Sequence, residues 1–154
     1  LSETNAVGEL CVRGPQVMKG YWKSEVSGLD ENNWFMTGDI ARIDETGNIF
    51  IVDRKKDMII VSGFNVFPNE VEAVVNEHPS VLECGCVGIE GEDSQELVKV
   101  FIVLHDGQSA SEDEIIDFCR EKLTAYKVPK HIEFINEIPK TNVGKVLRRE
   151  LKEN

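Results

Sequence analysis

Hydrophobic and polar residues alternate with a period of two over the first third of the chain, which predicts β-strands. The apolar runs lie at 8–12, 34–36, 41–43 and 49–52. Glu45-Thr46-Gly47-Asn48 separates the last two runs and is a strong signal for a β-hairpin. A bend is expected at Thr37-Gly38-Asp39, and the polar, turn-rich stretch 23–33 is expected to be a loop. This part of the chain is therefore predicted to be rich in β-structure.

A charged joint follows this first third. Arg54, Lys55 and Lys56 stand together between the apolar run 49–52 and a second run at 58–61. Each cation must keep its charged head solvated or paired, so three of them between buried strands do little for stability. We interpret the joint as a place where an anion binds or where the chain moves. The order expected here is strand, joint, strand, glycine turn and helix.

Beyond the joint the pattern changes to alternating helices and strands. A helix is predicted from Pro68, which a first helical turn tolerates, to the break at Pro79. Ser111 and Glu114 have the spacing of a capping box, which opens a second helix. The other expected elements are strands at 81–89, 97–104 and 132–135, a surface turn at 90–96, and a turn with a short basic helix at 139–153.

The predicted fold class is α+β. Residues 1–55 are expected to form the β-rich end of a larger domain. Residues 56–154 are expected to form a small α/β domain whose mixed sheet is flanked by helices, and about a hundred residues suffice for a domain that folds alone. The boundary is placed at the joint, near Lys56.

The composition excludes some partners. The chain has 154 residues, of which 41% are hydrophobic, and this is enough for a core. Its 28 acidic and 17 basic residues give a net charge of -11, which would repel nucleic acid and anionic membranes. Cations nevertheless gather at two places, which either suit a small polyanion such as a nucleotide or are solvated surface charges. They are Arg54, Lys55 and Lys56, and then Lys140, Lys145, Arg148, Arg149 and Lys152.

Location and thiol chemistry also follow from the sequence. No apolar run is long enough to span a bilayer and no signal peptide is recognised, so we expect a cytoplasmic protein with at most peripheral association with the inner membrane. The chain opens at Leu1 within polar sequence, which suggests a piece of a longer protein. The cysteines lack paired C-x-x-C spacing, so we expect reduced, mostly buried thiols and no metal site. They are Cys11, Cys84, Cys86 and Cys119.

Two residues stand in a sequence context that suits ligand binding or catalysis. Asp39 follows a glycine, and its carboxylate could accept both hydroxyls of a ribose, although alone it is more simply a turn aspartate. Lys145 follows Gly144 in an otherwise uncharged turn and precedes two arginines, so a mobile ammonium is offered beside further positive charge. Such an ammonium suits negative charge that develops on a phosphoryl or carboxyl oxygen. Alone, Lys145 is more simply a solvated lysine.

In combination, the sequence resembles the late core motifs of the adenylate-forming enzymes. Four motifs occur in the same order and cover almost the whole chain, from Gly8 to Lys152. They are Gly8-Glu9-Leu10 through Gly20-Tyr21-Trp22, Asn33 to Asp39, Asp53 to Asp57 with Ser62-Gly63 and Glu70-Val71-Glu72, and Pro139 to Lys145 with Arg148. Within the family the chain most resembles bacterial long-chain fatty-acyl-CoA synthetases. Asn33 stands where that branch commonly has glycine.

The resemblance implies roles for individual residues. Asp39, assisted by Arg54, would hold the ribose hydroxyls of ATP and of the acyl-adenylate. Lys56 would be the hinge about which the small C-terminal domain rotates. Lys145 would be catalytic, because it would bridge the substrate carboxylate and the nucleotide as pyrophosphate leaves. The path of the CoA pantetheine would be lined by Ser62, Gly63 and Phe64, where glycine lets a ligand pass close to the backbone.

The resemblance also implies an activity. The full-length protein would be an ATP-dependent fatty acid:CoA ligase that forms acyl-CoA through an acyl-adenylate, with fatty acid, ATP and CoA as its small-molecule substrates. The phosphate loop and the ligand of Mg²⁺ would precede residue 1, in a large N-terminal domain that is the partner of this segment. The segment alone is expected to be inactive. Two alternatives stay open: an enzyme for another acid, such as an aryl or amino acid, and a non-catalytic lid or interaction domain.

Overall fold

The computed structural model describes residues 6–22, 28–91 and 95–153. The chain divides into two compact units, residues 1–56 and 57–154, which are described separately. The division falls beside Lys56, while the role of this residue as a pivot stays a prediction. Parts of the expected loops at 23–33 and 90–96 lie outside the described residues. No helix in the described part of the chain is long and apolar enough to cross a membrane.

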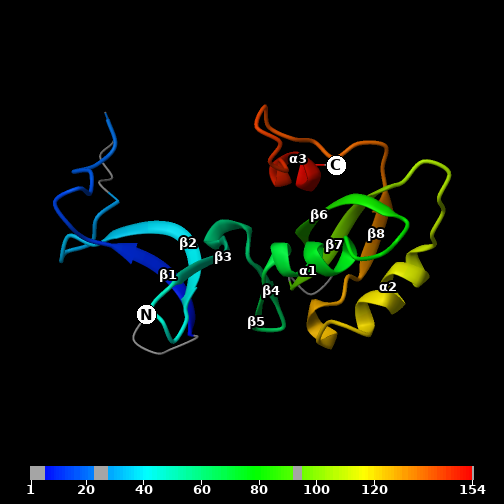
Figure 1. Cartoon of the computed structure of the whole chain (residues 1–154), viewed down its shortest axis with the longest axis horizontal. Coiled ribbons are helices and arrows are strands. Elements are labelled where there is room, and N and C mark those ends of the chain that lie inside the picture. Colours follow the sequence, from blue (N-terminus) through cyan, green and yellow to red (C-terminus); the bar gives the residue numbers. More distant parts are fainter. Residues whose placement is uncertain (1–5, 23–27, 92–94, 154) are drawn as a thin grey trace. The chain divides into compact units, whose positions relative to one another are not determined.

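The first unit contains an antiparallel sheet of three strands, β1 (Val7–Val12), β2 (Phe35–Ile43) and β3 (Ile49–Arg54), with β2 in the middle (Figure 1). The predicted bend at Thr37-Gly38-Asp39 is wrong, because β2 runs through it. Gly38 adopts a φ of 74°, and the register of β2 against β3 shifts between Ile40 and Ala41, two residues further along the strand. The glycine and the bulge thus absorb the irregularity without ending the strand.

The hairpin between β2 and β3 is confirmed. The Asp44 carboxylate accepts hydrogen bonds from the side chains and backbone amides of Thr46 and Asn48, which closes the turn. These hydrogen bonds, led by that of the Thr46 side chain, lower the pKa of Asp44 to about 2. Asn33 has a φ of 62°, a conformation that asparagine tolerates better than most residues, so the loop can turn here without glycine.

Arg54, the first cation of the charged joint, ends β3, and Lys55 and Lys56 lie in a short 3₁₀ turn, η1 (Lys55–Asp57). A two-stranded hairpin of β4 (Ile59–Val61) and β5 (Phe64–Val66) follows it in the second unit. β5 was not predicted, since a direct passage from glycine turn to helix was expected. Ser62 and Gly63 connect the strands with φ values of 50° and 82°, and two consecutive positive values match the twist of a tight hairpin.

The main sheet of the second unit has the order β6-β7-β8 and consists of β6 (Val81–Glu90), β7 (Glu96–Leu104) and β8 (His131–Phe134). β6 and β7 are antiparallel, whereas β7 and β8 are parallel and are joined through α2 (Glu112–Arg120) and η2 (Ala125–Lys127). The other helices are α1 (Pro68–Val75) and α3 (Arg148–Glu153). The predicted mixed sheet flanked by helices is therefore confirmed, as is the capping box of Ser111 and Glu114.

Helix α1 is shorter than predicted. It ends at Val75 instead of reaching Pro79, because the next amides bond one residue closer along the chain: Glu77 donates to the Val74 carbonyl and His78 to the Val75 carbonyl. The last turn before the proline is thus tightened.

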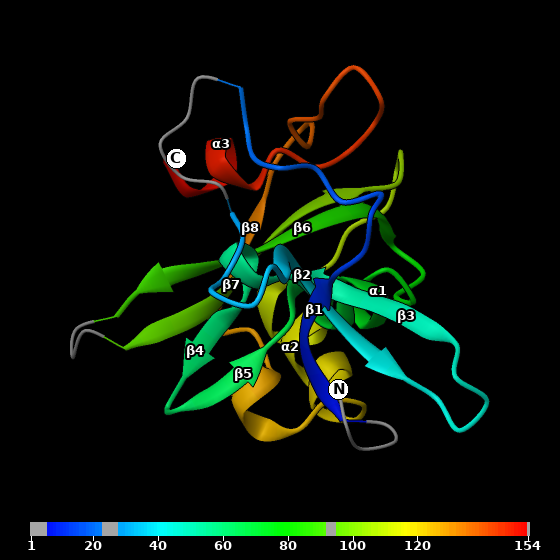
Figure 2. The same ribbon diagram turned by 90° about the vertical axis from the view of Figure 1, so that its left-hand side faces the viewer.

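Two apolar clusters cover opposite faces of the main sheet. One face packs against α1, α2 and the β4–β5 hairpin, and its members include Val71, Ile115 and Val66. The other packs against the C-terminal segment and α3, through Ile138 and Leu151. Figures 1 and 2 show α3 on one side of the sheet and α2 on the other. The second unit therefore has three layers.

The four cysteines lie in the described part of the chain and form no disulfide there, and three of them are buried. Burial raises the pKa of Cys84 to about 12 and that of Cys119 to about 11. Cys86 is fully buried in the first cluster, whereas Cys11 in β1 is half-buried. Three of them therefore serve as small core residues.

Gly85 in β6 lets the C-terminal segment approach the sheet closely. A Cβ atom there would lie 2.6 Å from Cδ1 of Leu151 and 3.3 Å from Cγ1 of Val146. We expect Gly85→Ala to lower the free energy of unfolding by roughly 1–3 kcal/mol through overpacking, measured by urea denaturation.

The Leu151→Ala background supplies the control for this overpacking. Leu151→Ala alone should cost about 2–5 kcal/mol, because it opens a cavity at a buried site. Gly85→Ala should cost less in that background, since the clashing methyl group is gone. Equal costs in both backgrounds would show that the close approach does not limit position 85.

Candidate functional site

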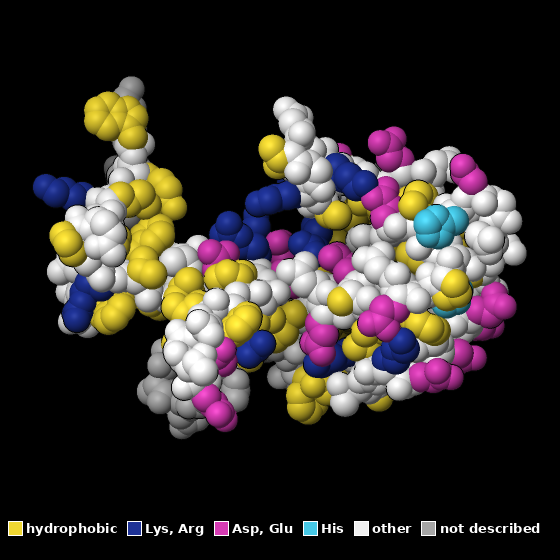
Figure 3. All heavy atoms as spheres, viewed as in Figure 1, with side chains coloured by type: hydrophobic (Ala, Val, Ile, Leu, Met, Phe, Trp, Pro, Cys, Tyr) yellow, Lys and Arg dark blue, Asp and Glu magenta, His cyan; other side chains and the backbone are white. Residues whose placement is uncertain are grey.

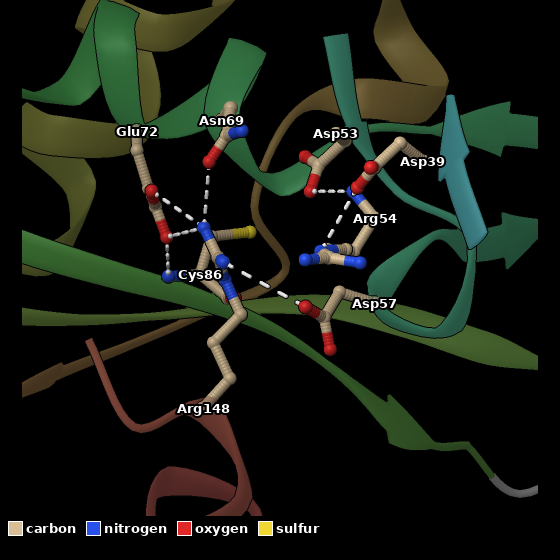
Figure 4. Close-up of polar contacts among 8 residues, drawn as sticks. All are labelled: Asp39, Asp53, Arg54, Asp57, Asn69, Glu72, Cys86 and Arg148. Carbon is tan, nitrogen blue, oxygen red and sulfur yellow. Dashed lines mark hydrogen bonds and ion pairs between the residues drawn. The ribbon is translucent and has the colours of Figure 1, made fainter. Parts of the chain in front are cut away.

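Asp39 and Arg54 are direct neighbours in the antiparallel pairing of β2 with β3. Nε of Arg54 lies 3.0 Å from Oδ1 of Asp39, and the side chains are 56% and 25% exposed (Figure 4). The Thr37 hydroxyl accepts from the amide of Asp39 and donates to the Leu10 carbonyl, which fixes the backbone at this point. The structure thus brings together the two residues that the sequence assigned to the ribose, with the carboxylate still accessible.

The three cations of the joint have different surroundings. Nζ of Lys55 lies 2.6 Å from Oε2 of Glu9, and this partner raises the pKa of Lys55. Lys55 is thus 56% exposed and paired with Glu9 at the same time. Lys56 is exposed and forms no ion pair with any residue the structure describes. Only Lys56 of the three is left without a carboxylate partner, which is compatible with a residue that must move.

Ser62, Gly63 and Phe64 form the exposed tip of the β4–β5 hairpin. The Ser62 hydroxyl donates to Oε1 of Gln95 at 3.1 Å, and the Phe64 ring stacks on Tyr126 with the ring centres 4.6 Å apart. A Cβ atom at Gly63 would meet no atom within 4 Å. An open cavity of about 450 Å³ lies beside the turn and is lined by Ile60, Ser62, Gly63, Gln95 and Glu96. The residues expected to line the pantetheine path thus share an accessible surface.

Lys145 lies at the end of a tight turn in the C-terminal segment. Lys140 and Val146 pair across the turn, and the Thr141 amide donates to the Lys145 carbonyl at 2.8 Å. Gly144 adopts a φ of 79°, and the Lys145 amide donates to the Thr141 hydroxyl. The Lys145 side chain is exposed and forms no ion pair among the described residues. Backbone hydrogen bonds therefore fix the base of the turn while the ammonium stays free.

Arg148 differs from its expected role as additional positive charge beside Lys145. Its side chain is only 16% exposed, and Nη2 donates to both carboxylate oxygens of Glu72 at 2.8 Å (Figure 4). Nη2 also donates to Oδ1 of Asn69 at 2.8 Å, and Nε donates to the Cys86 carbonyl at 3.2 Å. The interpretation of Arg148 as a free cation is therefore wrong, because Glu72 neutralises it.

A second ion pair fixes the other end of the Lys145 turn. Nζ of Lys140 contacts Oε2 of Glu83 in β6. The turn is thus held to the sheet before and after Lys145, and its segment lies above the sheet in Figure 1 and projects from the surface in Figure 3. The same view shows mostly Asp and Glu side chains around α2, in agreement with the acidic first turn of this helix (Figure 3).

Sequence reasoning missed the role of Glu72, although it quoted this residue as part of a motif. One signal could have found it: a carboxylate near the start of a helix, on the side opposite its solvent face, requires a buried cation as partner.

In residues 6–22, 28–91 and 95–153, no group of three or more His, Cys, Asp or Glu side chains could hold a metal ion.

The comparisons with known proteins decide the family. Residues 70–145 match the model of the AMP-binding enzyme C-terminal domain. The chain carries the C-terminal domain of an AMP-binding, adenylate-forming enzyme. This domain includes the Glu72 carboxylate and the Lys145 turn.

Individual relatives agree with this assignment. The chain is 57% identical over 148 residues to a long-chain-fatty-acid–CoA ligase of Escherichia coli O157:H7, which covers 95% of this chain and 26% of the relative. It thus spans about a quarter of the length of that curated relative. Among solved structures, ATP-bound MatB from Rhodopseudomonas palustris superimposes with a TM-score of 0.91 at 32% identity, over 98% of this chain and 31% of that one.

A further solved structure is that of o-succinylbenzoate CoA synthetase from Bacillus subtilis in complex with its acyl-adenylate intermediate. Its TM-score is 0.86 at 36% identity, and the match covers 99% of this chain and 31% of that one. The ATP-bound and the acyl-adenylate-bound protein therefore both share the architecture of this chain.

The exposure of Lys145 in this AMP-binding C-terminal domain can be tested directly. We expect limiting acetic anhydride to modify Lys145 faster than Lys99 and Lys127, as measured by mass spectrometry of the digested chain. The two comparison lysines are only 19% and 17% exposed and are paired with Glu133 and Glu70. If Lys145 reacted as slowly as these two, its ammonium would have a partner in solution.

Proposed function

We propose that the chain is the mobile catalytic part of an ATP-dependent long-chain fatty acid:CoA ligase. In the first step the fatty acid carboxylate attacks the α-phosphorus of ATP, and the bond to pyrophosphate breaks. In the second step the CoA thiolate attacks the acyl carbonyl, and AMP leaves with the electrons of the broken bond. Acyl-CoA, AMP and pyrophosphate are the products.

The observation that carries this proposal is the position of two accessible groups on opposite faces of one sheet. The turn with Lys145 belongs to the segment that packs through Val146 and Leu151, whereas the hairpin tip at Gly63 belongs to the side of α1 and α2. The two segments lie above and below the sheet in Figure 1. A small domain built in this way could offer a cation from one face and a thiol path from the other.

The two half-reactions need this separation. Adenylation requires a cation near the charge that develops as pyrophosphate leaves, and preorganised electrostatic groups of this kind supply a large share of catalysis. Thioester formation requires that the cation withdraws and that a narrow path for the pantetheine takes its place. Rotation about Lys56, the proposed hinge, would exchange one face for the other.

The nucleotide would bind to the first unit. Asp39 would accept hydrogen bonds from the ribose hydroxyls, and Arg54 would assist it and hold its carboxylate in place. Lys145 would approach the nucleotide and the substrate carboxylate only during adenylation. ATP-bound and acyl-adenylate-bound relatives of the same architecture support this placement. The Mg²⁺ ligand and the phosphate loop would belong to the large domain, without which the segment would not turn over.

A fatty acid is the proposed substrate because the 57% identical relative is a long-chain-fatty-acid–CoA ligase. The o-succinylbenzoate enzyme, at 36% identity, supports an aromatic acid as the second candidate. Pyrophosphate exchange with a panel of both kinds of acid, on the full-length enzyme, separates the two. Exchange by residues 1–154 alone would contradict the need for the large domain.

Lys145→Ala in the full-length enzyme should abolish adenylation selectively. We expect a loss of about 10²–10³-fold in the rate of pyrophosphate exchange, because the cation acts mainly on the transition state. Thioester formation from supplied acyl-adenylate should stay nearly unchanged. Lys152→Ala, an exposed lysine on α3, is the matched control and should leave both rates intact. Equal losses in the two half-reactions would refute the division of labour.

Gly63→Leu should have the opposite effect. The side chain would enter the open space beside the turn, so we expect thioester formation to fall by at least about tenfold while pyrophosphate exchange is retained. Gly107→Leu provides the control for backbone strain, since Gly107 has a similar φ of 74° and equally open surroundings. Normal thioester formation in Gly63→Leu would refute the pantetheine assignment.

A further inference from the structure

Arg148 joins three segments of the second unit through a single guanidinium. It is the first residue of α3, and it contacts Glu72 and Asn69 of α1 and the Cys86 carbonyl of β6. Its Nη1 also lies 3.9 Å from Oδ2 of Asp57, at the end of η1 (Figure 4). A planar, rigid fork of donors suits this task, whereas lysine offers only a point charge.

The contacts of Arg148 bear on the position of Lys145. Only two residues separate them, and both are held: Val146 packs against the second cluster, and the Leu147 amide donates to the Pro139 carbonyl at 2.8 Å. The chain from Lys145 to Arg148 therefore has little freedom to move independently. Fixing the guanidinium against Glu72 fixes the base of the Lys145 turn.

The Asp57 contact points toward the joint. Asp57 directly follows Lys56, and its carboxylate is 21% exposed. At 3.9 Å the contact is an ion pair without a hydrogen bond, so it is weaker than the two 2.8 Å bonds to Glu72. A change of backbone angle at residue 56 would thus alter the Asp57 contact first and leave the Glu72 contact intact.

We propose that Arg148 is a positioning residue that sets the Lys145 turn for adenylation and, through Asp57, couples it to the joint at Lys56. The coupling rests on the proposed function, since it gives the joint and Lys145 their roles in the reaction. The positioning rests on geometry alone. The competing view is that Arg148 only stabilises the fold, and two experiments separate these views.

The first experiment tests the geometry on the 154-residue chain without any activity. In Arg148→Lys, amide hydrogen exchange of Thr141, Gly144 and Lys145 should become at least about tenfold faster. The amides of α2 should keep their protection, and Arg120→Lys, in an exposed ion pair of that helix, should change nothing at the turn. Unchanged exchange at the turn overturns the proposal, and so does a uniform increase across the whole unit.

A second variant tests whether the effect of Arg148→Lys comes from the lost ion pair or from the lysine side chain itself. Glu72→Gln keeps the shape of the partner and one oxygen acceptor but removes its charge, so it should show the same local pattern in the turn with a smaller increase. Loss of protection throughout the unit in both variants would mean that the pair holds the fold and not the turn.

The second experiment uses the full-length enzyme. Arg148→Lys should lower the rate of pyrophosphate exchange by about tenfold or more, with the KM for ATP and thioester formation from supplied acyl-adenylate within about twofold of wild type. Equal losses in both half-reactions would overturn the positioning role. If none of the tested acids supported pyrophosphate exchange by the wild type, the proposed function would fail. Hydrogen exchange of the turn would still decide the geometry.

Asp57→Asn tests the link to the joint. If Asp57 acts through Arg148, the double variant Asp57→Asn with Arg148→Lys should exchange pyrophosphate no more slowly than Arg148→Lys alone. Multiplying effects would show that Asp57 acts independently, and this would overturn the coupling.

Discussion

The ion pair between Arg148 and Glu72 fixes where the C-terminal segment lies on the sheet of the second unit. Helix α3 has only six residues, too few to be stable without tertiary contacts. Two features hold it: Leu151 packs over Gly85, and Arg148 bonds Glu72 twice. Apolar packing alone would tolerate small sliding or rotation of so short a helix. The half-buried ion pair, in which Nη2 of Arg148 bonds both carboxylate oxygens of Glu72, does not tolerate such movement. Any shift would leave two charges poorly paired away from water. We therefore expect the pair to contribute more to the uniqueness of the position than to net stability.

The sheet β6-β7-β8 separates two surfaces of the second unit. Each of its faces is covered by a different part of the chain, so the β4–β5 hairpin and the Lys145 turn cannot interfere with each other. Gly85 keeps the C-terminal layer close to the sheet, and the pairing of Lys140 with Glu83 adds a second fixed point on that layer. The proposed rotation between half-reactions would use these two different faces, because turning the unit as one body would exchange them without rearranging its interior.

Local patterns predicted most elements, and contacts distant in sequence explain the errors. The alternation of strands, the hairpin at 45–48 and the capping box at Ser111 depend on residues close in the chain, so they could be read directly. β5 was missed because three residues carry no usable period. The pairing of Asp39 with Arg54 follows from the hairpin register, but that of Arg148 with Glu72 spans 76 residues. No spacing rule reaches so far, and Arg148 therefore looked like a surface cation.

The groups proposed to bind the nucleotide differ in how far their side chains are fixed. Asp39 and Arg54 lie on adjacent strands and already bond each other, so only one carboxylate oxygen is committed to the arginine. A ribose hydroxyl can donate to the other oxygen without breaking the pair, and the strands have lost their freedom in advance. Lys145 is the opposite case: its backbone is fixed and its ammonium is not. A group that must bind the nucleotide in both half-reactions benefits from being fixed, whereas a cation needed only in the first must be able to leave. Under the proposed function, the pairing of Asp39 with Arg54 and the unpaired ammonium of Lys145 would follow the timing of the reaction.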